Sequence, residues 1–179
     1  ILVRIIGGEF KGRSIQVAKN LPARPTTDFA REALFNVLNN GYHFEGRSVL
    51  DLFAGTGLIG LEFLSRGASS LVSVDFHQNC IKHLRQLSGS FESDWTVLRK
   101  NVFSFVPNCK VGFDFIFADP PYDNPKLKDI PTLILKNETI LNKNGLLILE
   151  HSKRDIFSEH INFVETRKYG NVNFSFFRK

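Results

Sequence analysis

The sequence has few of the residues that mark disulfide-bonded or metal-binding proteins. Only two of its 179 residues are cysteine. Cys80 and Cys109 are far apart and form no Cys-x-x-Cys pair, which argues against both a disulfide framework and a zinc site. The five histidines show no spacing typical of metal ligands. We therefore predict that the protein binds no metal and that both cysteines are small core residues.

Long apolar segments are also missing. The longest apolar runs span only a few residues, as in residues 146–149, whereas a helix that crosses a bilayer needs about 20. No segment has the composition of a signal peptide. We expect a cytoplasmic protein that acts as a monomer, with one domain large enough for a core and a small appendage.

What the sequence does have is a concentration of positive charge near its N-terminus. The net charge is +5, and residues 1–27 hold five basic side chains against one acidic side chain. Because Lys and Arg neutralise backbone phosphates, a basic appendage on a nearly neutral domain is typical of a nucleic-acid-binding protein. A solvated basic surface without a partner is the alternative.

Residues 1–45 are predicted to form this appendage, as a hairpin followed by a helix. Residues 3–6 and 14–17 have strand character, and the connector between them contains three glycines. Residues 21–26 then form an extended linker, because each residue before a proline is driven away from helical backbone. The appendage is too small for a core of its own, so we expect it to dock on the domain that follows.

The helix of the appendage is predicted to begin after Thr27, whose side chain can cap it. Asp28 in the first turn complements the helix dipole, and Gly41 lies just past the predicted end. Helical spacing gives this segment an apolar face composed of Phe29, Ala33, Leu34, Val37 and Leu38.

From residue 46 to 179 the pattern alternates between strand and helix, which predicts a second domain with a Rossmann-like α/β sheet. We place its strands at residues 48–52, 71–75, 95–100, 113–118 and 145–150, with helices after most of them. Residues 162–169 and 172–177 are joined by Gly170-Asn171, a hairpin turn. The sheet is therefore expected to be mostly parallel, with an antiparallel last strand.

A glycine motif follows the first strand of this sheet. Gly55, Gly57 and Gly60 stand in Gly-x-Gly-x-x-Gly order, which lets the backbone turn tightly and approach a ligand at a helix N-terminus. Asp75 ends the next strand about 20 residues later, where a carboxylate can accept hydrogen bonds from both hydroxyls of a ribose. An adenosine-containing cofactor is therefore predicted.

The glycine motif alone fits NAD as well as S-adenosylmethionine. Asp51 favours the second, because its carboxylate would repel a pyrophosphate but can receive the ammonium group of a methionine moiety. Phe76 is placed to pack on the adenine and Asn101 to bond its edge, although core packing and helix capping are the respective alternatives. The predicted cofactor-binding residues are Asp51, Phe53, Ala54, Gly55, Thr56, Gly57, Asp75, Phe76, Asn101, Val102 and Asp119.

The segment Asp119-Pro120-Pro121-Tyr122 directly follows the apolar strand at residues 113–118. It therefore lies at the carboxyl end of a parallel strand, where open α/β sheets bind their ligands. Two prolines stiffen the loop and remove two N–H donors, which leaves the Asp119 carboxylate and the adjacent carbonyls as acceptors. Such a loop can hold an exocyclic amine by its two N–H groups while the base stacks on Tyr122. We predict that all four residues are catalytic, with a proline-terminated strand and a helix cap as the alternative.

These motifs together resemble the RsmD family, the bacterial methyltransferases that act on N2 of guanine 966 in 16S rRNA. The resemblance runs almost end to end, through residues 4–13, 24–36, 51–68 and 119–122. It implies a Rossmann-like methyltransferase, S-adenosylmethionine as cofactor, and the small ribosomal subunit as substrate. The linker at residues 18–23 is short for the family and Ile59 departs from its usual pattern.

With this resemblance, the basic appendage is predicted to contact RNA. Arg31 is ambiguous, because it can also pair with Asp28 on its own helix. Methyltransferases acting on DNA amino groups share the Asp-Pro-Pro-Tyr motif, but a larger target-recognition region is expected in them. A nicotinamide-dependent oxidoreductase is a more distant alternative. The candidate RNA contacts are Arg4, Lys11, Arg13, Arg24, Thr26 and Arg31.

Overall fold

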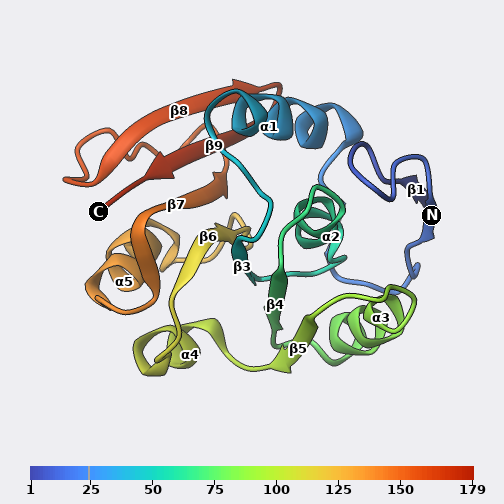
Figure 1. Ribbon diagram of the computed structural model, residues 1–179. Helices are drawn as coiled ribbons and strands as arrows, with labels where there is room; N and C mark the ends of the chain where they lie inside the picture. Colours follow the sequence, from blue (N-terminus) through green and yellow to red (C-terminus); the bar gives the residue numbers. More distant parts are fainter. Residues whose placement is uncertain (24) are drawn as a thin grey trace.

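The computed structural model describes residues 1–23 and 25–179, and its centre is a seven-stranded sheet in the order β5-β4-β3-β6-β7-β9-β8 (Figure 1). Strands β3 to β7 are parallel to one another, whereas β9 is antiparallel to both of its neighbours, β7 and β8. The predicted fold class is confirmed. The strands are β3 (Ser48–Leu52), β4 (Ser70–Asp75), β5 (Trp95–Arg99), β6 (Phe113–Ala118), β7 (Leu141–His151), β8 (Phe163–Tyr169) and β9 (Val172–Phe177).

Helices cover both faces of the sheet, because its central strands are apolar on both sides. On one face Phe115 and Phe117 pack in a core with α1 (Asp28–Gly41), α2 (Leu58–Ser65) and α3 (Gln78–Ser88). On the other face Ile116 and Ala118 pack with α4 (Val102–Asn108), the short 3₁₀ helix η1 (Leu127–Asp129) and α5 (Ile130–Lys136). In the described part of the chain, no helix is long and apolar enough to span a membrane.

The N-terminal hairpin consists of β1 (Leu2–Arg4) and β2 (Ser14–Gln16), which pair antiparallel. It lies near α2 and α3 (Figure 1). Val3, Ile5, Ile15 and Val17 are buried in the same core as α2 and the sheet. The expectation that the appendage docks on the larger domain is therefore confirmed, and the pairing is shorter than predicted at each strand end.

The helix α1 begins as predicted, since the Thr27 side chain accepts a hydrogen bond from the Ala30 amide at 3.2 Å. Its buried face is different from the predicted one. Phe29 is 66% exposed and stands against Tyr169 of β8, with ring centroids 6.2 Å apart. Gly41 lies inside the helix rather than past its end. The buried positions are Ala30, Arg31, Leu34, Phe35 and Leu38, a face rotated by about one residue and containing a charge.

Candidate active site

The site lies at the carboxyl ends of β3 and β6, which pair directly with Leu52 beside Ala118. From β3 the chain continues to β4 on one side of it, whereas β6 lies on the other side. This reversal of strand order leaves a crevice beyond the strand ends, the usual ligand site of an open α/β sheet. Both predicted motifs, the glycine loop after Leu52 and the segment from Asp119 to Tyr122, are therefore brought together here.

The larger hollow at this edge has a volume of about 380 Å³. Five predicted cofactor residues, Phe53, Asp75, Phe76, Asn101 and Val102, line it together with Asp119 and Pro121. Other lining residues were not predicted, because their side chains come from loops with no motif of their own. These are Pro22, Ala23, His77, Cys80, Phe103 and Asn124.

A smaller hollow of about 50 Å³ lies under the glycine loop, and Asp119 and Phe53 line both hollows. The remaining predicted cofactor residues on its wall are Asp51, Ala54, Gly55 and Thr56. Leu58, Ile59 and Phe117 complete that wall without having been predicted.

Gly57 differs from the other predicted cofactor residues, since it lines neither of these two hollows. It precedes α2 in a left-handed conformation, with φ of 75°. A Cβ atom there would lie 2.5 Å from Cδ2 of Leu84. The prediction of a cofactor contact is corrected to a structural one: this glycine lets the loop turn into α2 while α3 packs closely against it.

Asp75 holds the glycine loop in place. Its Oδ2 accepts a hydrogen bond from the Gly55 amide at 2.9 Å, and its Oδ1 accepts one from the His77 amide at 2.8 Å. Each carboxylate oxygen can accept a further hydrogen bond. Because Asp75 also lines the larger hollow, it is able to bind a pair of ribose hydroxyls there.

Phe76 and Asn101 show which of their alternatives the structure adopts. Phe76 is 65% exposed, so the alternative of core packing does not apply. Its ring borders the larger hollow, with the Arg99 guanidinium 5.8 Å from its centroid. Asn101 caps α4 by accepting a hydrogen bond from the Phe103 amide at 2.9 Å, and it borders the hollow as well. The cap uses its carbonyl oxygen, so its amide N–H groups remain possible donors to a ligand.

Three carboxyl groups meet behind the site, Asp51 from β3, Asp119 after β6 and Glu150 from β7. Asp51 and Glu150 are 2% and 4% exposed. Burial raises the pKa of Asp51, and burial together with the charges of Glu150 and Asp51 raises the pKa of Asp119. Burial also raises the pKa of Glu150 to about 7, against hydrogen bonds from Thr26 and Tyr122 that lower it. Sequence reasoning missed Glu150, because a single Glu at a strand end belongs to no motif.

Tyr122 lies on the far side of the catalytic segment from the larger hollow. Its hydroxyl donates to Oε1 of Glu150 at 3.2 Å, and its ring is 44% exposed. Burial of the hydroxyl raises its pKa, so the phenol stays protonated at neutral pH. The ring borders a further hollow of about 400 Å³, whose wall includes Lys153 and Arg154. The segment from Asp119 to Tyr122 therefore separates two hollows.

The predicted RNA contacts are distributed differently. Arg4 and Lys11 are exposed on the hairpin. Arg13 is exposed too, but its guanidinium donates to the Ser90 carbonyl at 2.9 Å and stacks 4.2 Å above the Phe91 ring. Thr26 donates to Oε2 of Glu150 at 3.1 Å, which places it at the site rather than on a basic surface. Arg24 lies outside the described residues.

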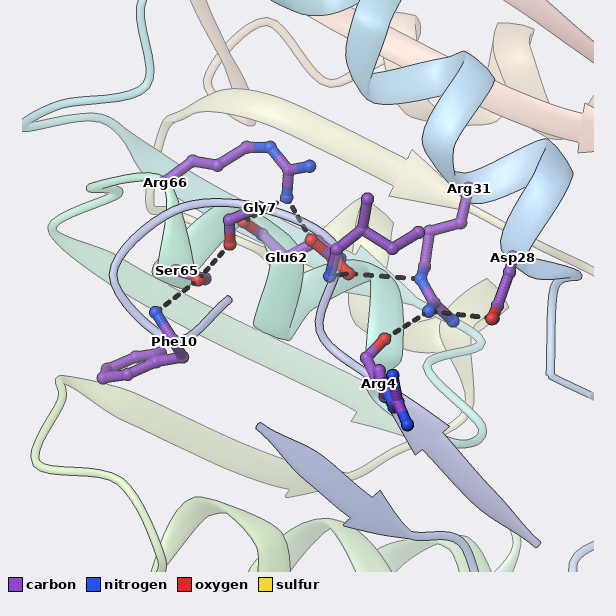
Figure 2. A network of polar contacts seen from close by, with 9 residues as sticks. Arg4, Gly7, Phe10, Asp28, Arg31, Glu62, Ser65 and Arg66 are labelled. Carbon is purple, nitrogen blue, oxygen red and sulfur yellow. Dashed lines mark hydrogen bonds and ion pairs between the residues drawn. The ribbon is translucent and has the colours of Figure 1, made fainter. Parts of the chain in front are cut away.

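The prediction that Arg31 contacts RNA is wrong. This side chain is fully buried, and it pairs with Asp28 at 3.0 Å and with Glu62 at 3.2 Å (Figure 2). It also donates to the Arg4 carbonyl at 2.6 Å. Arg66 contacts the second Glu62 oxygen. These residues fasten the hairpin and α1 to α2, so Arg31 acts in docking the appendage.

The residues at the site fit S-adenosylmethionine. Among the residues that the structure describes, the buried Oδ2 of Asp51 has no hydrogen-bond partner, and Asp51 lines the smaller hollow. A buried carboxylate oxygen needs a partner, and the ammonium group of the methionine moiety is suited to be one. Asp75 and Phe76 offer the ribose and adenine sites already described. A Rossmann-like sheet with this site at its strand ends defines an S-adenosylmethionine-dependent methyltransferase.

Comparison with known proteins gives the family. The family described as "Conserved hypothetical protein 95", which is the RsmD family, matches residues 3–178. The chain belongs to the RsmD family, as the resemblance of its motifs had predicted.

Individual relatives are similar over most of their length. The chain is 34% identical to YlbH of Bacillus subtilis over 99% of each chain. It is 36% identical to "Ribosomal RNA small subunit methyltransferase D" of Escherichia coli K12, with 75% of this chain and 68% of the relative covered. The solved structure of yhhF from Escherichia coli matches with a TM-score of 0.83 at 29% identity, over 98% of this chain and 97% of that chain.

Proposed function

We propose that this protein methylates the exocyclic N2 amine of a guanine in 16S rRNA of the small ribosomal subunit. The observation that carries the proposal is the position of the segment from Asp119 to Tyr122. Asp119 and Pro121 border the cofactor hollow, and Tyr122 borders the hollow with Lys153 and Arg154. A base that enters from the second hollow would meet Tyr122 and Asp119 together, beside two cations suited to its phosphates.

The substrate class is supported by the relatives. Proteins named "Ribosomal RNA small subunit methyltransferase D" from Escherichia coli and from Buchnera aphidicola are 36% and 31% identical to this chain. The exposed Arg4 and Lys11 of the hairpin are the proposed phosphate contacts of the appendage, residues 1–45, and they are the predicted contacts that make no described side-chain bond within the protein.

The Asp119 carboxylate has the central role in this proposal. The N2 amine of guanine is conjugated with its ring and is a poor nucleophile. Asp119 and the Pro120 carbonyl accept its two N–H groups and turn its lone pair toward the cofactor hollow, so the loop acts by positioning and electrostatics. S-adenosylmethionine, when bound, supplies an electrophilic methyl group on a sulfonium that keeps the carbon–sulfur electron pair as the new nitrogen–carbon bond forms. One proton then leaves the nitrogen, and Asp119 is its acceptor.

The raised pKa of Asp119 suits this task. Burial and two neighbouring carboxyl charges raise its pKa, which makes its ionised form a better proton acceptor than an ordinary aspartate. Pro120 is buried and Pro121 borders the hollow, so both prolines hold the acceptors at fixed positions. Tyr122 would stack on the extruded guanine.

Transfer of labelled methyl from S-adenosylmethionine to small ribosomal subunits that lack the modification tests the proposal. Digestion and nucleoside analysis should recover N2-methylguanosine. Recovery of another methylated nucleoside would change the acceptor atom and leave the family assignment intact. No transfer to subunits or free 16S rRNA, with cofactor binding confirmed, would overturn the proposed substrate and direct the assay to DNA.

A further inference from the structure

Glu150 connects two segments that are far apart in the sequence. It is one residue from the end of β7, which pairs with β6 at Ala118 and Leu149, so it lies beside the strand that ends in Asp119. One of its carboxylate oxygens accepts a hydrogen bond from Thr26 of the linker, and the other accepts one from Tyr122 of the catalytic loop. The carboxyl group therefore joins the linker of the N-terminal appendage to the loop that holds the substrate amine.

This position is unfavourable for a residue with no role beyond packing. A carboxyl group that is 4% exposed loses its hydration, and two neutral hydroxyl donors compensate for only part of that loss. Asp119 and Asp51 place further negative charge nearby. Glu150 borders none of the hollows beside the catalytic segment, so direct contact with the cofactor or the base does not explain it either.

We propose that Glu150 is a positioning residue of the methyl transfer: it holds the Tyr122 ring and the linker at Thr26 in place, and its charge makes Asp119 a stronger acceptor of the proton from the amine. This inference rests on the proposed function, since it assigns Glu150 a part in the same reaction. The proton moves from the substrate nitrogen to a carboxylate oxygen of Asp119, and no bond to Glu150 forms or breaks. Glu150 acts through Tyr122 and Asp119.

The pH dependence follows from the groups around Glu150. Asp119 and Tyr122 face it from the loop after β6, Asp51 follows through Asp119, and β9 on its other side carries no ionisable side chain. His151, the next residue on β7, bonds Ser175 at 2.6 Å. Two carboxyl groups this close titrate as a pair, and the first proton lost makes the second harder to lose. The transfer rate should therefore rise with pH on a limb near neutrality.

Single-turnover methyl transfer at saturating RNA and cofactor, measured from pH 5 to 9, tests the inference with two variants. Glu150→Gln removes the charge at nearly constant volume, so Asp119 ionises more easily and becomes a weaker acceptor. We expect the limb to move down by about one pH unit and the plateau rate to fall about tenfold. Thr26→Val removes a hydrogen bond that stabilises the Glu150 carboxylate, so the limb should move up.

The matched control is Glu138→Gln, the same chemical change at an exposed position before β7, at the opposite end of the sheet. It should leave both the limb and the plateau unchanged. Opposite shifts in the two test variants would be difficult to obtain from a general loss of structure. If wild-type protein methylates the RNA while Glu150→Gln keeps its rate and its limb, Glu150 has no positioning role and the proposed function still stands.

A second readout needs no reaction. The pKa of Glu150 in the folded protein, about 7, is above its usual value of 4.5, so the folded state binds this proton more tightly than the unfolded state. The stabilisation is present below pH 4.5 and is lost as pH rises toward 7. Urea unfolding of cofactor-free protein at pH 5 and pH 8 should therefore show a pH difference that is smaller in Glu150→Gln, by roughly 0.5–1 M in midpoint. An equal difference in both proteins would show that Glu150 is ionised as in water and would overturn the charge-based part of the inference.

Discussion

Two clusters of buried charge lie at opposite sides of α2 and the sheet, and they are built in opposite ways. Where the appendage docks, Arg31 and Arg66 surround Glu62, with Asp28 at the rim, so positive and negative charges balance (Figure 2). At the carboxyl ends of the strands, the site cluster consists of three carboxyl groups whose pKa values are all raised. These belong to Asp51, Asp119 and Glu150.

The difference separates a structural cluster from a functional one. In the docking cluster each Glu62 oxygen has a cationic partner, and Oε1 also accepts from the Ile6 amide at 2.8 Å. Ionised groups with complete partners contribute to holding one arrangement. In the site cluster like charges are kept together with few donors, which costs stability and tunes proton affinity. The strain is useful only if a cation and a proton-releasing substrate come to the site.

The largest effect on stability should come from breaking the balanced cluster. Glu62→Gln leaves the buried Arg31 with Asp28 as its only described anionic partner. We expect the free energy of unfolding to fall by about 3–5 kcal/mol and the melting temperature by on the order of 10 °C. The control is Glu165→Gln, which removes an exposed pair with Arg167 at 2.9 Å and should change stability by less than about 1 kcal/mol. Equal effects of the two substitutions would contradict the contrast between the clusters.

The same operation on the site cluster should affect turnover instead. Asp119→Ala removes the amine acceptor, so we expect the single-turnover rate to fall by about 10²-fold or more while cofactor affinity changes little. Its melting temperature should not decrease, because a buried charge beside two others is removed. Asp94→Ala, an exposed change at the other end of the sheet, is the control. Methylation by Asp119→Ala at near wild-type rate would rule out this mechanism.

Asp75 lies between the two extremes, because both of its oxygens are bonded and it still borders the hollow. Asp75→Ala removes the ribose acceptors and releases the Gly55 amide. We expect S-adenosylmethionine to bind about tenfold more weakly by calorimetry, with little change in the rate at saturating cofactor. Unchanged affinity would remove Asp75 from the cofactor site.

The smallest effects are expected on the exposed face of the appendage. The double substitution Arg4→Ala and Lys11→Ala should weaken RNA binding modestly and reduce the slope of log affinity against log salt by about 0.7 for each phosphate that the protein no longer neutralises. Lys110→Ala, an exposed change at the edge of the sheet opposite the site, is the control. A slope that equals that of the control would mean that the basic hairpin is only a solvated surface.

The contrast also shows where sequence reasoning succeeded. Strands β3 and β6 have the predicted bounds because a parallel strand buried on both faces is a continuous apolar run. The motif at Asp119–Tyr122 and the carboxylate at Asp75 were found for a similar reason, since both follow directly from strand ends. The carboxyl ends of adjacent parallel strands meet at one edge of the sheet, so local patterns sufficed to assemble the site.

Other features required contacts that no local pattern contains. The pattern around Arg31 predicts a surface cation, but its partner Glu62 is 31 residues away on another helix. Glu150 was missed because its bonds reach Thr26 across 124 residues and Tyr122 across 28. The glycine motif predicts a ligand contact at Gly57 because the sequence does not reveal that Leu84 packs against it.

The sequence by itself determined the sheet, the cofactor class and the catalytic segment of this protein, because each depends on residues that are neighbours along the chain or at adjacent strand ends. Only the tertiary structure decided which charges are buried and with whom. The reason is physical: the pKa and the stabilising effect of a charged side chain depend on its desolvation and on charges brought near by folding, not on its neighbours in sequence. The same residue types therefore became a docking cluster on one side of the molecule and a proton-accepting cluster on the other.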